Sequence, residues 1–164
     1  MNLLESARCL GGLRAVELAC FRRLGERAPR LGTPRCARWA ASASLAHAWR
    51  ASLLEDLLPV SAGLPALAEL TLLPDGALGV ELARTLPDLG DVPAPQSRDS
   101  QADDGRVLIA DLSGRLYPLL IGEYARRLEV ATPAADGAVV RTIGRAIADL
   151  EVIRAEGAAA SGHQ

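Results

Sequence analysis

The sequence predicts an all-α protein, an antiparallel four-helix bundle with one long crossover connector between its second and third helices. Three observations support this fold class. Ala, Leu and Arg dominate the composition and favour helix over strand. Apolar residues recur at helical spacing in four segments. Each half of the chain holds two such segments joined by a short turn, which is the connectivity of a bundle with one crossover. The 164 residues suffice for a single domain, residues 1–164.

The first half of the chain predicts two long helices. The first is expected over residues 3–28, and Pro29 and Gly32 should end it. Thr33 can cap the second helix with Pro34 in its first turn, and Pro59 should end this helix after about residue 58. The apolar stripe of the first helix consists of Leu10, Leu13, Cys20 and Leu24.

The connector covers about residues 60–105. Two short helices are expected in it, over residues 64–73 and 77–86, the second capped by Asp75. The alternative is a β-hairpin that turns at the same Asp75. Residues 88–104 are polar and rich in proline and serine, so we expect this stretch to be mobile.

The second half again predicts two long helices. The third helix is expected over residues 106–131, where Pro118 should either kink it or mark its start. Pro133 should end this helix, and Asp136 can cap the fourth. The tail, residues 158–164, is small and polar and should fray. The two stripes consist of Leu112, Leu116, Leu119, Leu120 and Leu128, and of Val140, Ile143, Ile147, Leu150 and Ile153.

Polar residues interrupt the four stripes at matching heights: Glu17 and His47 in the first hairpin, Glu123 and Asp149 in the second. The midpoint of each pair falls inside the turn of its hairpin, so the two members should lie level. A carboxylate in a dry core is costly unless it is paired, protonated or bound to metal. The four residues are therefore candidate ligands of one shared metal site.

Local pairing is the alternative explanation of the same residues. Glu17 can pair with Arg14 or Arg50, and Glu123 can pair with Arg127 four positions later. A lone histidine on an apolar face is commonly a hydrogen-bonded core residue. For the set of four residues, the sequence leaves both explanations open.

Short motifs around these positions resemble the ferritin-like superfamily, and within it the small proteins related to the tRNA-modifying di-iron hydroxylases. The motifs are Val16-Glu17-Leu18, Phe21-Arg22-Arg23-Leu24, Ser44-Leu45-Ala46-His47, Gly122-Glu123-Tyr124 and Asp149-Leu150-Glu151-Val152. A di-iron member of this superfamily has one carboxylate on each of two helices and a Glu-x-x-His pair on each of the other two. The chain departs from that pattern, because Ser44 and Val152 occupy two of the six ligand positions.

The resemblance implies a metal site with fewer ligands than a di-iron centre, which holds a single iron or manganese ion. Its ligands would be Glu17, His47, Glu123 and Asp149. The expected function is then an oxidoreductase acting on a small organic molecule.

The alternative is a metal-free ferritin-like protein that binds a ligand or a partner protein and lacks catalytic activity. Its bundle would keep a partly polar cavity rimmed by Tyr117, Tyr124, Trp39 or Trp49, with the two tyrosines as the cofactor-binding residues.

Charge bears on the partners. The formal net charge of −2 disfavours nucleic acid as a partner. The first fifty residues, however, hold nine arginines against Glu5, Glu17 and Glu26, and this asymmetry indicates a contact surface for an acidic partner. A homodimer is a further option. The arginines around the expected first turn are Arg22, Arg23, Arg27, Arg30, Arg35 and Arg38.

The cysteines and the N-terminus bear on the compartment. The three cysteines have no CxxC spacing, and an odd count predicts reduced thiols in a cytoplasmic protein. We expect no signal peptide, because the N-terminus lacks a basic start followed by an apolar run. We also expect no membrane span, since no stretch is long and uncharged enough.

Overall fold

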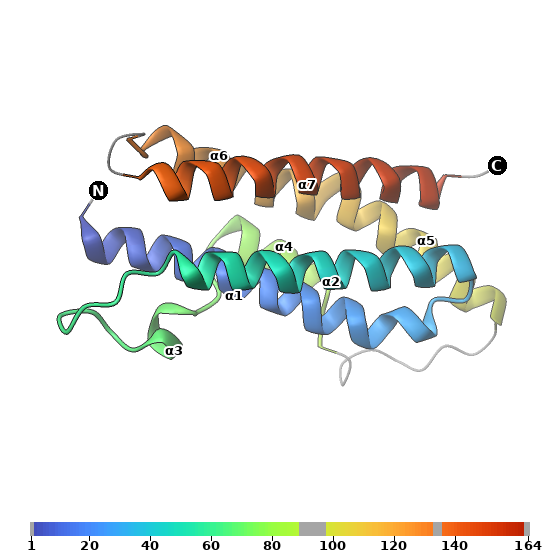
Figure 1. The fold of residues 1–164 in the computed structure, drawn as a ribbon. Helices are drawn as coiled ribbons and strands as arrows, with labels where there is room; N and C mark the ends of the chain where they lie inside the picture. The colour runs from blue at the N-terminus through green and yellow to red at the C-terminus, as the bar shows by residue number, and fades with distance from the viewer. Residues whose placement is uncertain (1, 89–97, 133–135, 163–164) are drawn as a thin grey trace.

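The computed structural model describes residues 2–88, 98–132 and 136–162 and is all-helical over these ranges, as predicted (Figure 1). No described residue belongs to a β-strand, so the hairpin alternative for the connector is wrong. Two helical hairpins pack side by side, one from each half of the chain (Figure 1). Among the described helices, none combines the length and the apolar run that a bilayer crossing requires.

The first hairpin consists of α1 (Leu3–Arg27) and α2 (Pro34–Asp56), joined by the 3-10 turn η1 (Ala28–Arg30). Both helix starts follow from local chemistry. Asn2 and Glu5 form a reciprocal capping box at α1. At α2 the hydroxyl of Thr33 accepts the backbone N–H of Cys36 at 3.2 Å, and Pro34 follows the cap, as predicted.

The third long segment is continuous from α5 (Arg98–Asp111) through the π-helical turn η3 (Leu112–Leu116) to α6 (Tyr117–Glu129). It begins at Arg98, so the prediction that mobile chain extends to residue 104 is wrong for its last residues; residues 89–97 lie outside the described ranges. Pro118 lies in the first turn of α6 and so marks the start of this helix, which was one of the two alternatives predicted for it. A proline has no N–H to donate and crowds the preceding turn, which agrees with the wider π turn just before it.

The fourth long helix is α7 (Gly137–Ser161). Asp136 precedes it, but the predicted side-chain cap is wrong. The Asp136 carboxylate instead accepts the backbone N–H of Thr132 at 3.0 Å and so closes the turn before the helix. The predicted fraying from residue 158 is also wrong as far as Ser161. Arg35 of α2 donates to the carbonyl of Ala159 at 2.6 Å and so ties this end of α7 to the first hairpin.

The connector contains a single-turn helix, α3 (Leu67–Leu70), and the longer α4 (Ala77–Thr85). Both lie within the predicted helical stretches, although α3 is shorter than expected. Asp75 does not cap α4, because the N-cap residue is Gly76 at φ 127°, with no side-chain hydrogen bond. A positive φ of this size is accessible to glycine at little cost.

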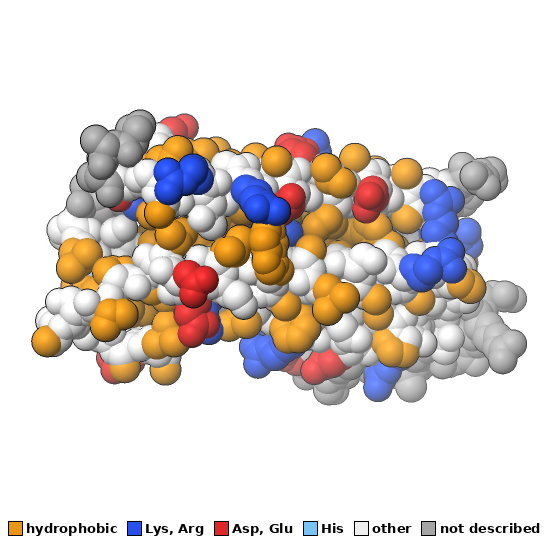
Figure 2. Space-filling view, viewed as in Figure 1, with side chains coloured by type: hydrophobic (Ala, Val, Ile, Leu, Met, Phe, Trp, Pro, Cys, Tyr) orange, Lys and Arg blue, Asp and Glu red, His pale blue; other side chains and the backbone are white. Residues whose placement is uncertain are grey.

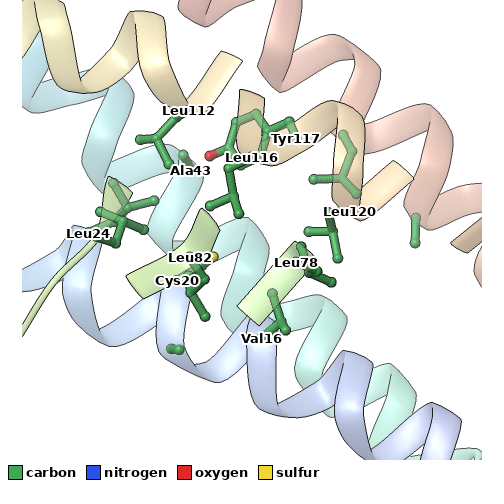
Figure 3. Close-up of a cluster of buried hydrophobic side chains, with 14 of the residues drawn as sticks. Val16, Cys20, Leu24, Ala43, Leu78, Leu82, Leu112, Leu116, Tyr117 and Leu120 are labelled. Carbon is green, nitrogen blue, oxygen red and sulfur yellow. The ribbon is translucent and has the colours of Figure 1, made fainter. Parts of the chain in front are cut away.

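The helix α4 contributes to the core between α1 and the η3–α6 segment. Its inward residues Leu78 and Leu82 are buried, and so is the following Leu86. In Figure 3, Leu78 and Leu82 lie between side chains of α1 on one side and Leu116 and Leu120 on the other. The connector therefore separates α1 from α6 along part of their length, and each burial of a leucine stabilises the fold by about 1.5–3 kcal/mol.

The cysteines are free thiols. Cys20 and Cys36 are buried and pack in the apolar core, while Cys9 is half-buried against it. Cys20 and Cys36 therefore act as small core residues, and Cys9 does so in part.

A pair of glycine substitutions tests the packing of the connector. Gly11→Ala should lower the free energy of unfolding by about 1–3 kcal/mol, because an added Cβ would lie 2.1 Å from the carbonyl oxygen of Leu70. Gly122→Ala is the matched control on α6, where a Cβ meets nothing within 4 Å; it should raise stability by about 0.5–1 kcal/mol. Urea unfolding followed by circular dichroism measures both. Equal shifts would show that α3 does not pack against α1 at Gly11.

Candidate functional site

Five polar side chains meet in the core between the two hairpins. Glu17 comes from α1, His47 and Arg50 from α2, and Tyr117 and Tyr124 from α6. Each is at most 1% exposed. Because the positions 47 and 50 are three apart on a helix, and 117 and 124 are seven apart, each pair shares one helix face. We call these five residues the core cluster.

The Glu17 carboxylate is the centre of the core cluster. Its Oε2 lies 2.5 Å from His47 Nδ1. Its Oε1 accepts the Nε–H of Arg50 at 3.0 Å and the hydroxyl of Tyr124 at 2.7 Å. Both carboxylate oxygens are therefore engaged by side chains of the protein itself.

The contacts of His47 assign its tautomer. A separation of 2.5 Å from a carboxylate oxygen requires a proton on Nδ1, so Nδ1–H donates to Glu17. Nε2 is then the acceptor for the hydroxyl of Tyr117 at 3.1 Å. With Nδ1 protonated, the Arg50 Nη2 group 2.8 Å away meets no free lone pair and gains no hydrogen bond from His47. His47 is thus the hydrogen-bonded core histidine of the local-pairing alternative.

Burial and charge together determine the ionisation of the core cluster. Burial by itself would raise the pKa of Glu17, but His47 and Arg50 outweigh it and lower that pKa to about 2. Burial lowers the pKa of His47 despite the neighbouring Glu17. Burial also opposes the charge on Arg50, but its ion pair with Glu17 raises the pKa of the guanidinium. The cluster therefore holds one carboxylate, one guanidinium and a neutral imidazole.

The remaining groups around the carboxylate stay protonated. Burial and the charge of Glu17 keep the pKa of Tyr124 well above its ordinary range, and burial does the same for Tyr117. Burial and the charge of Glu17 likewise raise the pKa of the Cys20 thiol. None of these groups is an activated nucleophile at neutral pH, because a reactive hydroxyl or thiol needs a lowered pKa or a free base beside it.

The structure brings together only two of the four predicted metal ligands, Glu17 and His47. Glu123 lies half-buried on α6 and forms an ion pair with Arg126. The partner predicted for it was the next residue, Arg127. Asp149 is half-buried on α7, away from the core cluster. Over the described ranges, no group of three or more His, Cys, Asp and Glu side chains is placed to share a metal ion.

Arg50, and not Arg14, is the arginine that pairs with Glu17. Arg14 instead forms an ion pair with Glu55 of α2 at 2.6 Å. Arg127 donates to the hydroxyl of Ser6 at 3.1 Å, so the alternative partner proposed for Glu123 is occupied elsewhere. Local pairing therefore describes the surroundings of Glu17 correctly and names the wrong partner for Glu123.

The donor set does not fit a resident metal ion. The guanidinium of Arg50 already neutralises Glu17, and a metal cation beside it would face strong repulsion in a low-dielectric core. Ser44, in a ligand position of the resemblance, donates to the carbonyl of Phe21 at 2.8 Å and so joins α1 to α2. Val152 occupies the other ligand position of the resemblance and is 57% exposed. Iron and manganese need several oxygen or nitrogen donors converging on one point, and these residues do not supply them.

The aromatic residues expected to rim a ligand cavity have other roles. Within the core cluster, Tyr117 donates a hydrogen bond to His47 and Tyr124 donates one to Glu17, a role that the sequence did not predict. Trp39 is buried, and its Nε1–H donates to the carbonyl of Ile153 at 3.2 Å. Trp49 is 41% exposed beneath the guanidinium of Arg145, which lies 4.6 Å from the ring centroid.

A surface groove of about 480 Å³ lies elsewhere, between α5, η3 and α7. It contains none of the predicted site residues. Its lining residues are Ala110, Ser113, Gly114, Arg154, Ala155, Ala158 and Ser161.

A comparison of the chain with family models, with curated proteins and with solved structures found no match. The resemblance to ferritin-like proteins therefore stays a prediction, and the geometry of the chain carries the functional argument.

The core cluster should make the protein sensitive to acid. As pH falls below about 6.5, the unfolded chain protonates its histidine before the folded chain protonates His47, so the free energy of unfolding should fall. Between 4.5 and about 2, the lowered pKa of Glu17 adds a loss in the same direction. Each proton contributes up to about 1.4 kcal/mol per pH unit. Urea unfolding from about pH 8 to about pH 3 measures the slope over the first range and the upper part of the second.

His47→Gln is the decisive variant and should flatten the slope between pH 6.5 and 4.5. His163→Gln, which replaces the only other histidine of the chain, is the control and should leave the slope unchanged. An unchanged slope in His47→Gln would contradict the neutral, buried imidazole.

Proposed function

We propose that this chain is a metal-free helical protein that binds an acidic partner through the turn between α1 and α2. The single observation that carries the proposal is a set of exposed arginines at this turn, Arg22, Arg30 and Arg38, that form no ion pair within the described ranges. We further propose that its four long helical segments form an antiparallel, ferritin-like bundle, with α4 inserted between the first and third. The pairing of these segments into two hairpins supports that architecture.

The core cluster supports a role at the surface of the molecule. Both oxygens of Glu17 and both ring nitrogens of His47 are engaged inside the enclosed cluster, so neither side chain is free to bind a substrate. Arg50 Nη1 is buried without a hydrogen-bond partner, and its position inside the core keeps it from a substrate at the surface. Buried ionic groups of this kind contribute to the specificity of packing, because their partners must come from particular helices at a particular height. We assign the core cluster this structural role.

The turn between α1 and α2 carries a concentrated positive charge. Arg22, Arg30 and Arg38 are exposed, and none of the three pairs with an acidic side chain within the described ranges. Arg27 and Arg35 donate only to backbone carbonyls, those of Arg23, Pro87 and Ala159. Figure 2 shows blue side chains at the end of the molecule that holds this turn.

Acidic groups are the chemistry that such a surface recognises. Guanidinium groups bind carboxylates in a bidentate, planar geometry, and several of them on one surface speed the encounter with an oppositely charged partner. An acidic protein surface fits this chain better than nucleic acid, since the overall charge of −2 would repel a long polyanion beyond the turn.

A glutamate-rich synthetic peptide is a direct probe of the turn. The triple variant Arg22→Ala, Arg30→Ala, Arg38→Ala should weaken its binding by about tenfold or more at low salt, because each arginine contributes Coulomb attraction. Isothermal titration calorimetry measures this at two salt concentrations. A control with the same change in net charge is Arg8→Ala, Arg115→Ala, Arg126→Ala, which should leave the affinity within about twofold. Equal losses in both triples would contradict a localised site.

One observation favours a second function, a mononuclear iron or manganese oxidoreductase acting on a small organic molecule. Glu17 and His47 lie 2.5 Å apart, and both side chains are common metal ligands. Metal binding would require the displacement of Arg50 from Glu17. Elemental analysis of protein purified without chelator tests this function. We expect less than about a tenth of an equivalent of iron or manganese, whereas a stoichiometric amount that His47→Ala removes would contradict our proposal.

A further inference from the structure

We propose that the exposed face formed by α2 and α7 binds a second copy of this chain in a two-fold symmetric, face-to-face dimer. This face adjoins the basic turn at Arg38 on α2, but the proposal does not depend on the function proposed above. It contains three large apolar side chains that the monomer leaves exposed: Leu45 at 69%, Val152 at 57% and Trp49 at 41%. In Figure 2 a band of apolar side chains follows the boundary between α2 and α7.

Two contacts define the register of α2 against α7. Trp39 donates to the carbonyl of Ile153, and Arg145 stacks on Trp49. The helices are therefore antiparallel, and Leu45 lies level with Ala148. This level is near the middle of both helices, so a two-fold axis in the plane of the face at this height would pair each helix with its own copy along most of its length.

The pattern around this level is self-complementary. Antiparallel pairing of α7 with its copy about Ala148 brings Arg141 opposite Ala155 of the second copy and next to Glu156, and the reverse by symmetry. Arg141 and Glu156 are both exposed and form no ion pair in the monomer within the described ranges. On α2, antiparallel pairing about Leu45 brings the small Ala41 opposite Trp49 of the second copy. Opposite charges at the ends and small-against-large contacts near the centre are what a self-recognising face requires.

A glycine inside α7 points to a close neighbour on this face. Gly144 is exposed, and a Cβ added to it would meet nothing within 4 Å in the monomer. Glycine inside a helix costs about 0.5–1 kcal/mol relative to alanine, and the packing of the monomer does not require it here. Together with the neighbouring Ala148 and Ala155, Gly144 lets a second helix approach closely.

The size of the face fits a stable dimer. The helices α2 and α7 contain 23 and 25 residues. With about 1.5 Å of rise per residue and about 10 Å between axes, they present a face on the order of 35 Å by 20 Å, close to the roughly 800 Å² per partner of a stable interface. A second copy is therefore a sufficient occupant.

Sedimentation velocity of the purified full chain over a range of concentrations tests the proposal. We expect a dimer, and Leu45→Glu should raise its dissociation constant by at least about tenfold, because it buries a charge at the two-fold axis. Val80→Glu is the matched control: Val80 is also 69% exposed but lies on α4, so this variant should dimerise normally. Circular dichroism verifies that both variants are folded.

A charge exchange tests the symmetry itself. Arg141→Glu should weaken the dimer, because it brings two acidic groups together at each end of the α7 pair. The double variant Arg141→Glu, Glu156→Arg should restore it, since each pair is then merely reversed. A wild-type chain that stays monomeric at high concentration, a dimer indifferent to Leu45→Glu, or a double variant no better than the single one would each overturn the proposal. Loss of peptide binding at the basic turn, by contrast, would not affect it.

Discussion

The rest of this structure depends on the neutralisation of one buried carboxylate. Glu17 is completely enclosed and ionised, and an isolated charge in a dry core would cost several kcal/mol. Its partners come from α2 and α6, so α1 must lie against both at one height for the charge to be tolerated. Apolar burial is non-directional, whereas these hydrogen bonds require one arrangement of the helices. The core cluster thereby determines how the two hairpins meet.

The connector is the second determinant of the architecture. A crossover between two hairpins could pass outside the bundle, but α4 inserts its leucines between α1 and the η3–α6 segment. On α6 it is Tyr124 that faces Glu17, whereas the neighbouring Glu123 forms an ion pair with Arg126 nearer the surface. Two polar residues at matching heights therefore belong to different environments, one enclosed and one half-exposed. Matching heights along parallel stripes were necessary for a shared metal site, but they were insufficient.

The closed interior directs attention to the surface. At the surface, two groups of residues lack partners within the described ranges: arginines that form no ion pair at the α1–α2 turn, and apolar side chains on the α2–α7 face. The first is electrostatic and the second is apolar, so they suit different partners and respond differently to salt. A chain that binds an acidic partner at one end while it dimerises along one side would present two copies of the basic turn.

The sequence by itself determined the helical class, the long helices and the first turn with its Thr33 cap, because helical periodicity and capping are local properties. It also identified Glu17 and His47 as inward residues, since both interrupt an apolar stripe. Only the tertiary structure decided what these two residues meet. The choice of Arg50 over Arg14, the tyrosine donors from α6 and the insertion of α4 all depend on contacts between segments far apart in the chain. A stripe shows which side of a helix faces inward, but the partner across the core depends on how the segments pack.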